Sequence, residues 1–252
     1  MALAALSQPL RERFQTARDL LEKPVGQEDW NHRIPTRVEA FDRLLVGGLA
    51  RGELVELIGY RSSGRFSLVL TALATATCAG EPAALIDLGD HFDPQQALTL
   101  GTDLERLLWL RPRNLKEALR STEILITGGF PLVVLDMGMP PVPGGRGAQS
   151  SWQRLGKAAR DHRSALLVSA PYRSSGTAAT AVVETKKIRA TWRGGGLSPR
   201  LLECLSTRMT LCKARGRASG ATTELHLQFD TGAISKLPFF SSSSSSYSSS
   251  RG

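Results

Sequence analysis

The sequence has little cysteine, few aromatic residues and no long apolar run. Its 252 residues include 3 Cys, and aromatic residues make up 6% of the chain. Cys78, Cys204 and Cys212 are too few and too widely spaced for a disulfide framework, and they lack the CxxC spacing of a zinc site. No segment approaches the roughly 18 consecutive apolar residues that span a bilayer. These absences argue against a disulfide-stapled or membrane-spanning protein, and we expect no metal.

The apolar run at the start of the chain is also short. It meets its first charge at Arg11, too early for a secretory signal. The chain is 41% hydrophobic and 22% charged, which is typical of a soluble globular protein. Its length suits one α/β domain with appendages. We therefore expect a cytoplasmic protein that does not contact a membrane.

Acidic residues are scarce in one part of the chain. The whole sequence holds 32 Lys+Arg against 23 Asp+Glu, a net charge of +9. Between residues 146 and 217, 15 basic residues stand against 3 acidic ones, so this segment carries 15 − 3 = +12 and the rest 9 − 12 = −3. Solvated side chains on helix faces account for about half of the basic residues. The remaining asymmetry predicts a polyanionic partner.

The two ends of the chain differ from its middle. Residues 1–32 are expected to form a helix and a linker, because apolar residues recur on one helical stripe. This stripe consists of Leu10, Phe14, Ala17 and Leu21. Residues 233–252 contain a serine tract with nothing to bury, which predicts a disordered tail. Residues 33–232 remain as the folded core.

Short apolar strands alternate with helices over most of this core. The expected strands are 53–59, 83–87, 131–136 and 164–171, and the expected helices are 67–80, 94–100, 115–127 and 151–163. This alternation predicts an α/β fold with a mostly parallel β-sheet flanked by helices. Residues 206–213 and 223–229 alternate apolar and polar side chains around a turn-forming segment, which predicts a C-terminal antiparallel hairpin. Ligands of such sheets bind at the carboxyl ends of the strands.

A Gly/Ser-rich loop follows the first of these strands. Residues 59–67 have the outline of a P-loop, in which glycines let backbone N–H groups converge on phosphate at a helix N-terminus. The usual lysine position holds Arg65, and the next position, whose hydroxyl would bind Mg²⁺, holds Phe66. The candidate nucleotide-binding residues here are Gly59, Ser62, Ser63, Gly64, Arg65 and Ser67. A strand-to-helix turn that keeps its glycines for packing remains an equal alternative.

Four spaced segments make the pattern more specific. Residues 47–70, 85–94, 100–112 and 128–136 resemble, in order and spacing, the ATPase core of the RecA recombinases. Within that superfamily the chain most resembles the ImuA group of bacterial RecA-like proteins. The resemblance covers roughly residues 33–190 and implies a RecA-like fold.

The resemblance also assigns catalytic roles, and the chain departs from several of them. The position of the glutamate that activates water holds Gly89, and the position of the glutamine that senses the γ-phosphate falls within Ser169 to Tyr172. Asp136 matches the aspartate that supports Mg²⁺, although a strand end that caps the next loop is an equal alternative. Together with Arg65 and Phe66, these changes predict a degenerate ATPase with no catalytic residue and no required cofactor. Whether nucleotide binds stays open.

In RecA, DNA-binding loops follow the strands that match those ending at Asp136 and Pro171. Their counterparts, residues 137–154 and 172–193, carry basic residues beside Trp152, Tyr172 and Trp192. Such mixtures suit phosphate contact and base stacking, although Trp152 also fits a core position. The candidate residues for binding single- or double-stranded DNA without sequence preference are Arg146, Arg154, Arg173, Lys186, Lys187, Arg189 and Arg193.

Resemblance to the ImuA group implies an accessory role in SOS-induced mutagenic translesion synthesis. The implied partners are ImuB, a catalytically inactive Y-family-like polymerase, and an error-prone polymerase of the replicative alpha-subunit class. RecA itself is a further candidate partner, by fold similarity. The expected location is the nucleoid-associated cytoplasm.

Two alternatives from other classes remain. One is a DNA-dependent ATPase or recombinase that uses Arg65 and Asp90 as substitutes for the missing groups. The other is a RecA-like inhibitor of cell division. Oligomeric state and partner interfaces are left open by the sequence.

Overall fold

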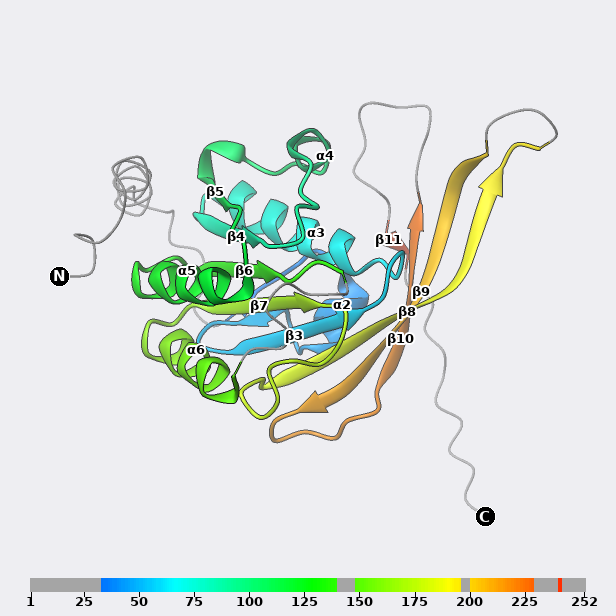
Figure 1. Cartoon of the computed structure of the whole chain (residues 1–252). Coiled ribbons are helices and arrows are strands. Elements are labelled where there is room, and N and C mark those ends of the chain that lie inside the picture. Colours follow the sequence, from blue (N-terminus) through cyan, green and yellow to red (C-terminus); the bar gives the residue numbers. More distant parts are fainter. Residues whose placement is uncertain (1–32, 140–147, 196–199, 229–239, 242–252) are drawn as a thin grey trace, which may run out of the picture.

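A computed structural model describes residues 33–139, 148–195 and 200–228, and the backbone of residues 240–241. Most of the strands form one nine-stranded sheet in the order β11-β10-β9-β8-β3-β7-β6-β4-β5 (Figure 1). These strands are β3 (Leu54–Gly59), β4 (Ala83–Asp87), β5 (Leu107–Leu110), β6 (Leu132–Asp136), β7 (Ala165–Ala170), β8 (Ala181–Arg193), β9 (Leu201–Ala214), β10 (Thr222–Gln228) and β11 (Phe240–Ser241). A separate antiparallel pair consists of β1 (Arg33–Ile34) and β2 (Leu49–Ala50).

The parallel half of the sheet runs from β3 to β5. Strands β4, β6 and β7 are buried at every position, as expected of apolar strands covered on both faces. Their helices and one 3₁₀ turn are α2 (Glu39–Leu44), α3 (Arg65–Cys78), α4 (Pro94–Thr99), η2 (Leu104–Arg106), α5 (Leu115–Thr127) and α6 (Gln149–Asp161). Helix α3 packs in one core cluster, whereas α5 and α6 pack in the other, on the opposite face of the sheet (Figure 1).

Local signals in the sequence fix where several helices begin. The side chain of Asn114 accepts a hydrogen bond of 3.0 Å from the backbone N–H of Glu117, which caps α5. Asp93 caps α4 in the same way, through the N–H of Gln95 at 2.9 Å. Helix α3 instead begins after Gly64, which has a left-handed φ of 79°. Glycine adopts this conformation without steric strain, so the loop turns sharply into the helix.

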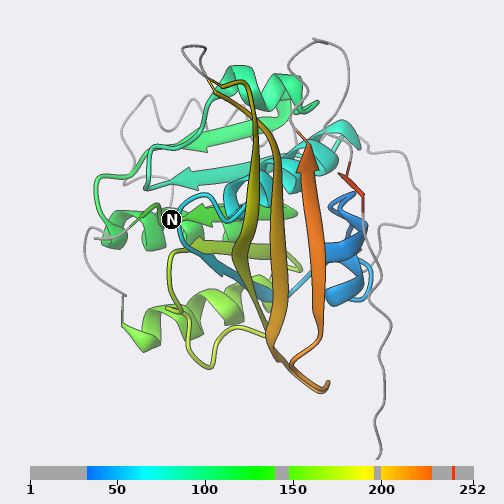
Figure 2. The ribbon, with the colours of Figure 1, turned by 90° about the vertical axis from the view of Figure 1, so that its right-hand side faces the viewer.

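The antiparallel half consists of β8 to β11. Strand β8 pairs in parallel with β3 as far as Thr185 and then continues beyond the end of β3, paired with β9. We call residues 186–193 of β8 and their partners 201–208 of β9 the arm. Strand β10 pairs with β9 only as far as Cys204, and beyond that point the ends of β8 and β9 project from the body as a two-stranded ribbon (Figure 1). In Figure 2 the antiparallel strands face the viewer, and no described helix lies in front of them.

The structure confirms the expected α/β class and the mostly parallel sheet flanked by helices. It also confirms the C-terminal antiparallel hairpin, which consists of β9 and β10. The placement of residues 172–193 in a loop is wrong over most of its length, because residues 181–193 form β8. Residues Ala181 to Val183 are buried, so this strand completes the core before it emerges into the arm.

The expected helix and linker of residues 1–32 lie outside the described residues. Within the segment expected to be a tail, residues 240–241 pair with β10 as β11. The other residues of the tail are not described. Within the described ranges, none of the helices combines the length and the apolar character that a bilayer crossing requires.

Candidate functional site

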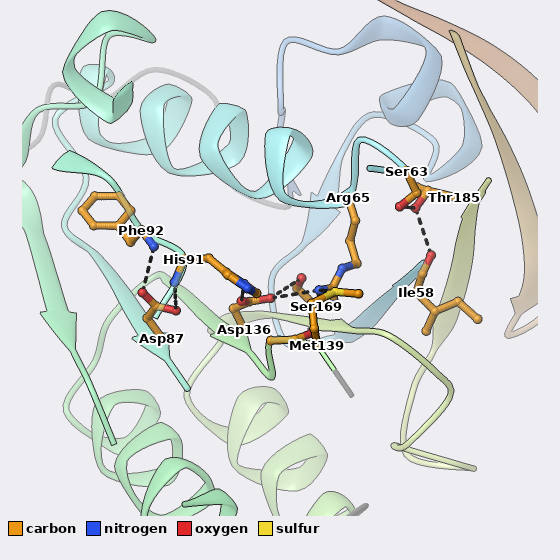
Figure 3. A network of polar contacts seen from close by, with 11 residues as sticks. Ile58, Ser63, Arg65, Asp87, His91, Phe92, Asp136, Met139, Ser169 and Thr185 are labelled. Carbon is orange, nitrogen blue, oxygen red and sulfur yellow. Dashed lines mark hydrogen bonds and ion pairs between the residues drawn. The ribbon is translucent and has the colours of Figure 1, made fainter. Parts of the chain in front are cut away.

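The Gly/Ser-rich loop connects β3 to α3 at the carboxyl edge of the parallel strands. A Cβ atom at Gly59 would overlap the side chain and the backbone of Thr185 on β8, so the loop needs glycine there. The hydroxyl groups of Ser63 and Thr185 lie 2.8 Å apart, and Thr185 donates to the Ile58 carbonyl at 3.1 Å (Figure 3). The predicted phosphate contact Ser63 is thus turned toward β8, whereas Ser62 is exposed.

Arg65 occupies the first turn of α3 and is 4% exposed. Its Nη2 donates a hydrogen bond of 2.8 Å to the carbonyl of Gly138 and lies 3.8 Å from Oδ1 of Asp136 (Figure 3). Burial lowers the pKa of Arg65, and the charge of Asp136 opposes this effect. Its Nη1 has no hydrogen-bond partner among the described residues.

Asp136 ends β6 and is fully buried. Its Oδ1 accepts a hydrogen bond of 2.7 Å from the hydroxyl of Ser169, and its Oδ2 lies 3.1 Å from Nδ1 of His91 (Figure 3). The hydrogen bond to Asp136 raises the pKa of His91. Both carboxylate oxygens therefore have protein partners, of which Arg65 carries a positive charge and His91 carries one when its ring is protonated.

A second carboxylate positions His91. Asp87, at the end of β4, accepts hydrogen bonds from the backbone N–H groups of His91 at 3.1 Å and Phe92 at 3.0 Å (Figure 3). It also accepts one from the indole of Trp109 at 3.3 Å. The ring of Phe66 meets the ring of His91 edge to face, with centroids 5.9 Å apart. These contacts hold the loop after β4 in place, so that the imidazole of His91 lies against Asp136.

The position of the expected catalytic glutamate has no room for a side chain. A Cβ atom at Gly89 would overlap the Cα atom of Gly138 and come within 2.8 Å of the His91 ring. Gly138 has a φ of 73°, which also favours glycine. The next carboxylate, Asp90, forms an exposed ion pair with Arg111 at 2.7 Å instead of facing the loop.

The residues at this edge do not fit a magnesium ion. The hydroxyl that would bind it is replaced by the ring of Phe66, and the carboxylate of Asp136 is already paired with Arg65 and His91. Within the described residues, no group of three His, Cys, Asp or Glu side chains has the arrangement of a metal site.

A cavity of about 500 Å³ opens beside the loop. One wall consists of loop residues and the N-terminus of α3, and the other includes Leu202 and Leu205 of β9. Arg65 and His91 also line it, so a guanidinium and an imidazole border the same space. The cavity lies where ligands of parallel sheets bind, at the carboxyl ends of the strands.

Comparison with known proteins identifies the family. Residues 27–167, more than half of the chain, match the RecA N-terminal domain. The chain belongs to the RecA family. It is 40% identical to RecA of Streptomyces avermitilis over 112 residues, which is 44% of this chain and 30% of that protein. It is 42% identical to RecA of Clavibacter michiganensis subsp. michiganensis over 112 residues, 44% of this chain and 31% of that protein.

The chain thus matches about a third of the length of these RecA relatives. Among solved structures, the RadB recombinase is similar with a TM-score of 0.59 and 21% identity, covering 77% of this chain and 96% of that one. This likeness shows the fold. The expectation of a RecA-like α/β fold is therefore confirmed by sequence and by structure.

The predicted DNA-binding residues of this RecA-family chain fall into separate places. Lys186, Lys187, Arg189 and Arg193 share β8 and lie on the arm, whereas Arg146 lies outside the described residues. Arg154 is on α6, paired with Glu123 of α5 at 2.9 Å, at the opposite side of the molecule from the arm (Figure 1). Arg173 is exposed in the segment between β7 and β8. Trp152 is fully buried, so its core interpretation is correct.

Sequence reasoning missed three polar residues of this region. His91 and Thr185 complete the contacts described above. Glu56 is fully buried in β3 and accepts hydrogen bonds from the backbone N–H groups of Ser174, at 2.6 Å, and Ser175, at 3.1 Å. A glutamate inside the apolar run of residues 54–59 was the available signal for Glu56.

Proposed function

We propose that this RecA-family protein is a non-catalytic adaptor that acts on DNA without hydrolysing ATP. The observation that carries the proposal is the pairing of Asp136 with Arg65, His91 and Ser169. In a phosphoryl-transfer site the corresponding carboxylate must be free to support a metal ion. Here the charge of Asp136 is balanced by side chains of the same chain.

Loss of hydrolysis follows from positioning and charge. Phosphoryl transfer depends on groups that hold the attacking water and stabilise the developing charge, and losing one such group costs about a hundredfold or more in rate. Gly89 offers no carboxylate to the water, and its contact with Gly138 leaves no space for one. Phe66 offers no hydroxyl.

The role we propose for the adaptor is in SOS-induced mutagenic translesion synthesis, a form of DNA damage tolerance. Support comes from the resemblance of residues 47–70, 85–94, 100–112 and 128–136 to the ImuA group. The proposed partners are an ImuB-type inactive Y-family polymerase, an error-prone alpha-class polymerase and RecA. Binding to the division tubulin, with none to these partners, would favour the cell-division inhibitor.

The arm supports a DNA-binding role. Lys186, Lys187 and Arg189 are exposed on it, and no described acidic side chain forms an ion pair with them. Arg193 is paired with Glu203 of β9. Trp192 is 53% exposed beside these charges, as in surfaces that combine phosphate contact with base stacking. We therefore propose the arm as the principal DNA contact.

ATP turnover tests the loss of catalysis. The full-length protein is assayed with and without single-stranded DNA, beside an Asp136→Ala variant purified in parallel. We expect the same background rate in all samples. DNA-stimulated turnover that Asp136→Ala abolishes would refute the proposal and establish a DNA-dependent ATPase.

Charge neutralisation tests the arm. The triple variant K186Q/K187Q/R189Q is compared with K157Q/R160Q/R163Q, which removes three exposed charges, two on α6 and one just after it. We expect weaker DNA binding in the arm variant alone, with a salt slope reduced by about 2 to 3. Equal losses in both variants would mean that net charge, and not the arm, governs binding.

A further inference from the structure

One edge of strand β8 has no partner strand along the arm. Strand β8 pairs with β3 only as far as Thr185, whereas its other edge pairs with β9 from Ala181 to Arg193. Among the described residues, no strand pairs with the edge of residues 186–193 that faces away from β9. In Figure 1 the end of β8 projects from the body together with β9. This free edge presents a row of backbone N–H and C=O groups that can pair with a further strand.

The arm also carries exposed apolar side chains. Ile188 is 45% exposed, Trp192 is 53% exposed and Leu201 is 49% exposed. In the part of the chain that the structure describes, half of the large apolar side chains that are exposed lie on this ribbon. Aliphatic side chains such as those of Ile188 and Leu201 offer no aromatic surface for stacking on bases. Their exposure on the arm indicates contact with a protein segment in addition to DNA.

The charges along the free edge determine the sign of the partner. In one cross-strand row, Arg208 of β9 stands between Lys186 of β8 and Glu224 of β10. The guanidinium of Arg208 pairs with Glu224 at 3.2 Å, so the acidic side chain of this row is already engaged. No described acidic side chain pairs with Lys186, Lys187 or Arg189. A strand added beside β8 places a residue opposite Lys186, and a carboxylate there supplies the opposite charge.

A second copy of this chain fits the free edge poorly. Two copies paired along residues 186–193 would bring Lys186, Lys187 and Arg189 against like charges, which is destabilising. Register shifts after Lys187 and after Thr191 also interrupt the regular pairing of the strand. Lysines and bulges are features with which natural proteins discourage pairing between identical edges. An acidic segment, in contrast, is attracted by the same basic side chains.

We propose that an extended acidic segment of a partner protein adds as a strand to the free edge of β8 along the arm. The backbone of residues 186–193 forms the hydrogen bonds of the new ladder, and Lys186, Lys187 and Arg189 pair with carboxylates of the segment. At about 3.3 Å per residue, the free edge accommodates a segment of about six to eight residues. The inference rests on the proposed function, because it gives the adaptor a mode of contact with a protein partner.

Designed peptides test this inference on the full-length protein. The first peptide has about eight residues, the length of the free edge, and alternates glutamate with valine. The second has the same sequence with two adjacent central backbone nitrogens methylated, so it keeps its charge and loses a ladder donor on each of its edges. The third carries lysine in place of glutamate. In fluorescence anisotropy, we expect the first peptide to bind at least about tenfold more tightly than either of the others.

Hydrogen exchange and a pair of variants locate the bound peptide. We expect slower exchange of backbone amides within residues 186–193, because those that face the free edge gain an acceptor, and no change in α6. K186E/K187E should weaken binding of the first peptide at least about tenfold. K157E/R160E reverses two exposed charges on α6 and should leave the affinity within about twofold of the parent. Circular dichroism confirms that both variants fold.

Several outcomes would overturn the inference. One is no binding of the first peptide, and another is binding without protection of residues 186–193. Equal binding of the methylated peptide would mean that charge alone acts, as on a surface that only binds DNA. A dimer in light scattering that protects the same residues without any peptide would assign the edge to a second copy. ATP turnover and the salt slope of DNA binding are unaffected by these outcomes, so they decide the proposed function separately.

Discussion

The parallel half of the sheet and the arm differ in whether their charged side chains are paired within the fold or exposed. At the carboxyl edge of the parallel strands, Arg65 and His91 both pair with Asp136. On the arm, Lys186 and Arg189 are exposed and without a described ion-pair partner. A buried charge must be balanced within the fold, whereas an exposed charge stays available to a partner. The proposed adaptor role rests on this contrast between paired charges at the carboxyl edge and unpaired charges on the arm.

The largest effect should follow removal of the central buried carboxylate. Asp136→Ala leaves Arg65 buried without a counter-charge, so we expect the free energy of unfolding to fall by about 3–5 kcal/mol. Asp90→Ala removes an exposed carboxylate paired with Arg111, each side chain 59% exposed, and should cost less than about 1 kcal/mol. Chemical denaturation measures both. Similar losses would mean that the two ion pairs are equivalent.

A substitution at Gly89 tests the close backbone contact between Gly89 and Gly138. Gly89→Glu restores the residue type expected of an active enzyme, but its Cβ atom overlaps Gly138. We expect it to destabilise the fold by about 1–3 kcal/mol and to yield no ATP turnover. The control is Gly195→Glu, whose Cβ meets no atom within 4 Å. A stable Gly89→Glu variant that hydrolyses ATP would show that one missing carboxylate was the whole defect.

The arm should behave in the reverse manner, with binding affected and folding unaffected. Trp192→Ala removes an exposed ring, and we expect it to weaken single-stranded DNA binding by about 1–3 kcal/mol, the value of one stacked base. The unfolding free energy should stay within about 0.5 kcal/mol of the parent. Fluorescence anisotropy gives the affinity, with Leu98→Ala, another exposed apolar residue at 49%, as the control. A large stability loss in Trp192→Ala would place this ring in the core.

The smallest effect concerns pH. The pKa of His91 is raised by its hydrogen bond to Asp136, so its charged form stabilises the fold. This contribution is fully present below the ordinary histidine pKa of about 6.5 and is lost as the pH rises through the higher folded value. Because the ring is 36% exposed, we expect less than about 1 kcal/mol. His91→Gln should remove this part of the pH dependence of unfolding, and an unchanged profile would contradict the pairing.

Much of the parallel half could be predicted from the sequence. Most of its strands are short apolar runs, and two of these runs end at a carboxylate, Asp87 in β4 and Asp136 in β6. The departures at Arg65, Phe66 and Gly89 are visible in the sequence because the spacing around them is preserved. The sequence therefore indicated that the P-loop and the position of the catalytic glutamate differ from those of the RecA ATPase core.

The rest depends on contacts between segments that are distant in the chain. That Arg65 reaches Gly138, or that Gly89 packs on Gly138, follows from the meeting of two strand ends and leaves no local pattern. Strand β8 was missed because its second half is charged and exposed, and because register shifts near Lys187 and Thr191 break the alternation of a strand.

A double-mutant cycle between Arg65 and Asp136 tests most directly whether Asp136 is stabilised by pairing with a side chain of the same chain. Unfolding free energies are measured for the parent, Arg65→Met, Asp136→Asn and the double variant. We predict a coupling energy of about 0.5–3 kcal/mol, with the double variant more stable than the sum of the single losses implies. Additive losses would mean that the two charges do not stabilise each other and would contradict the account.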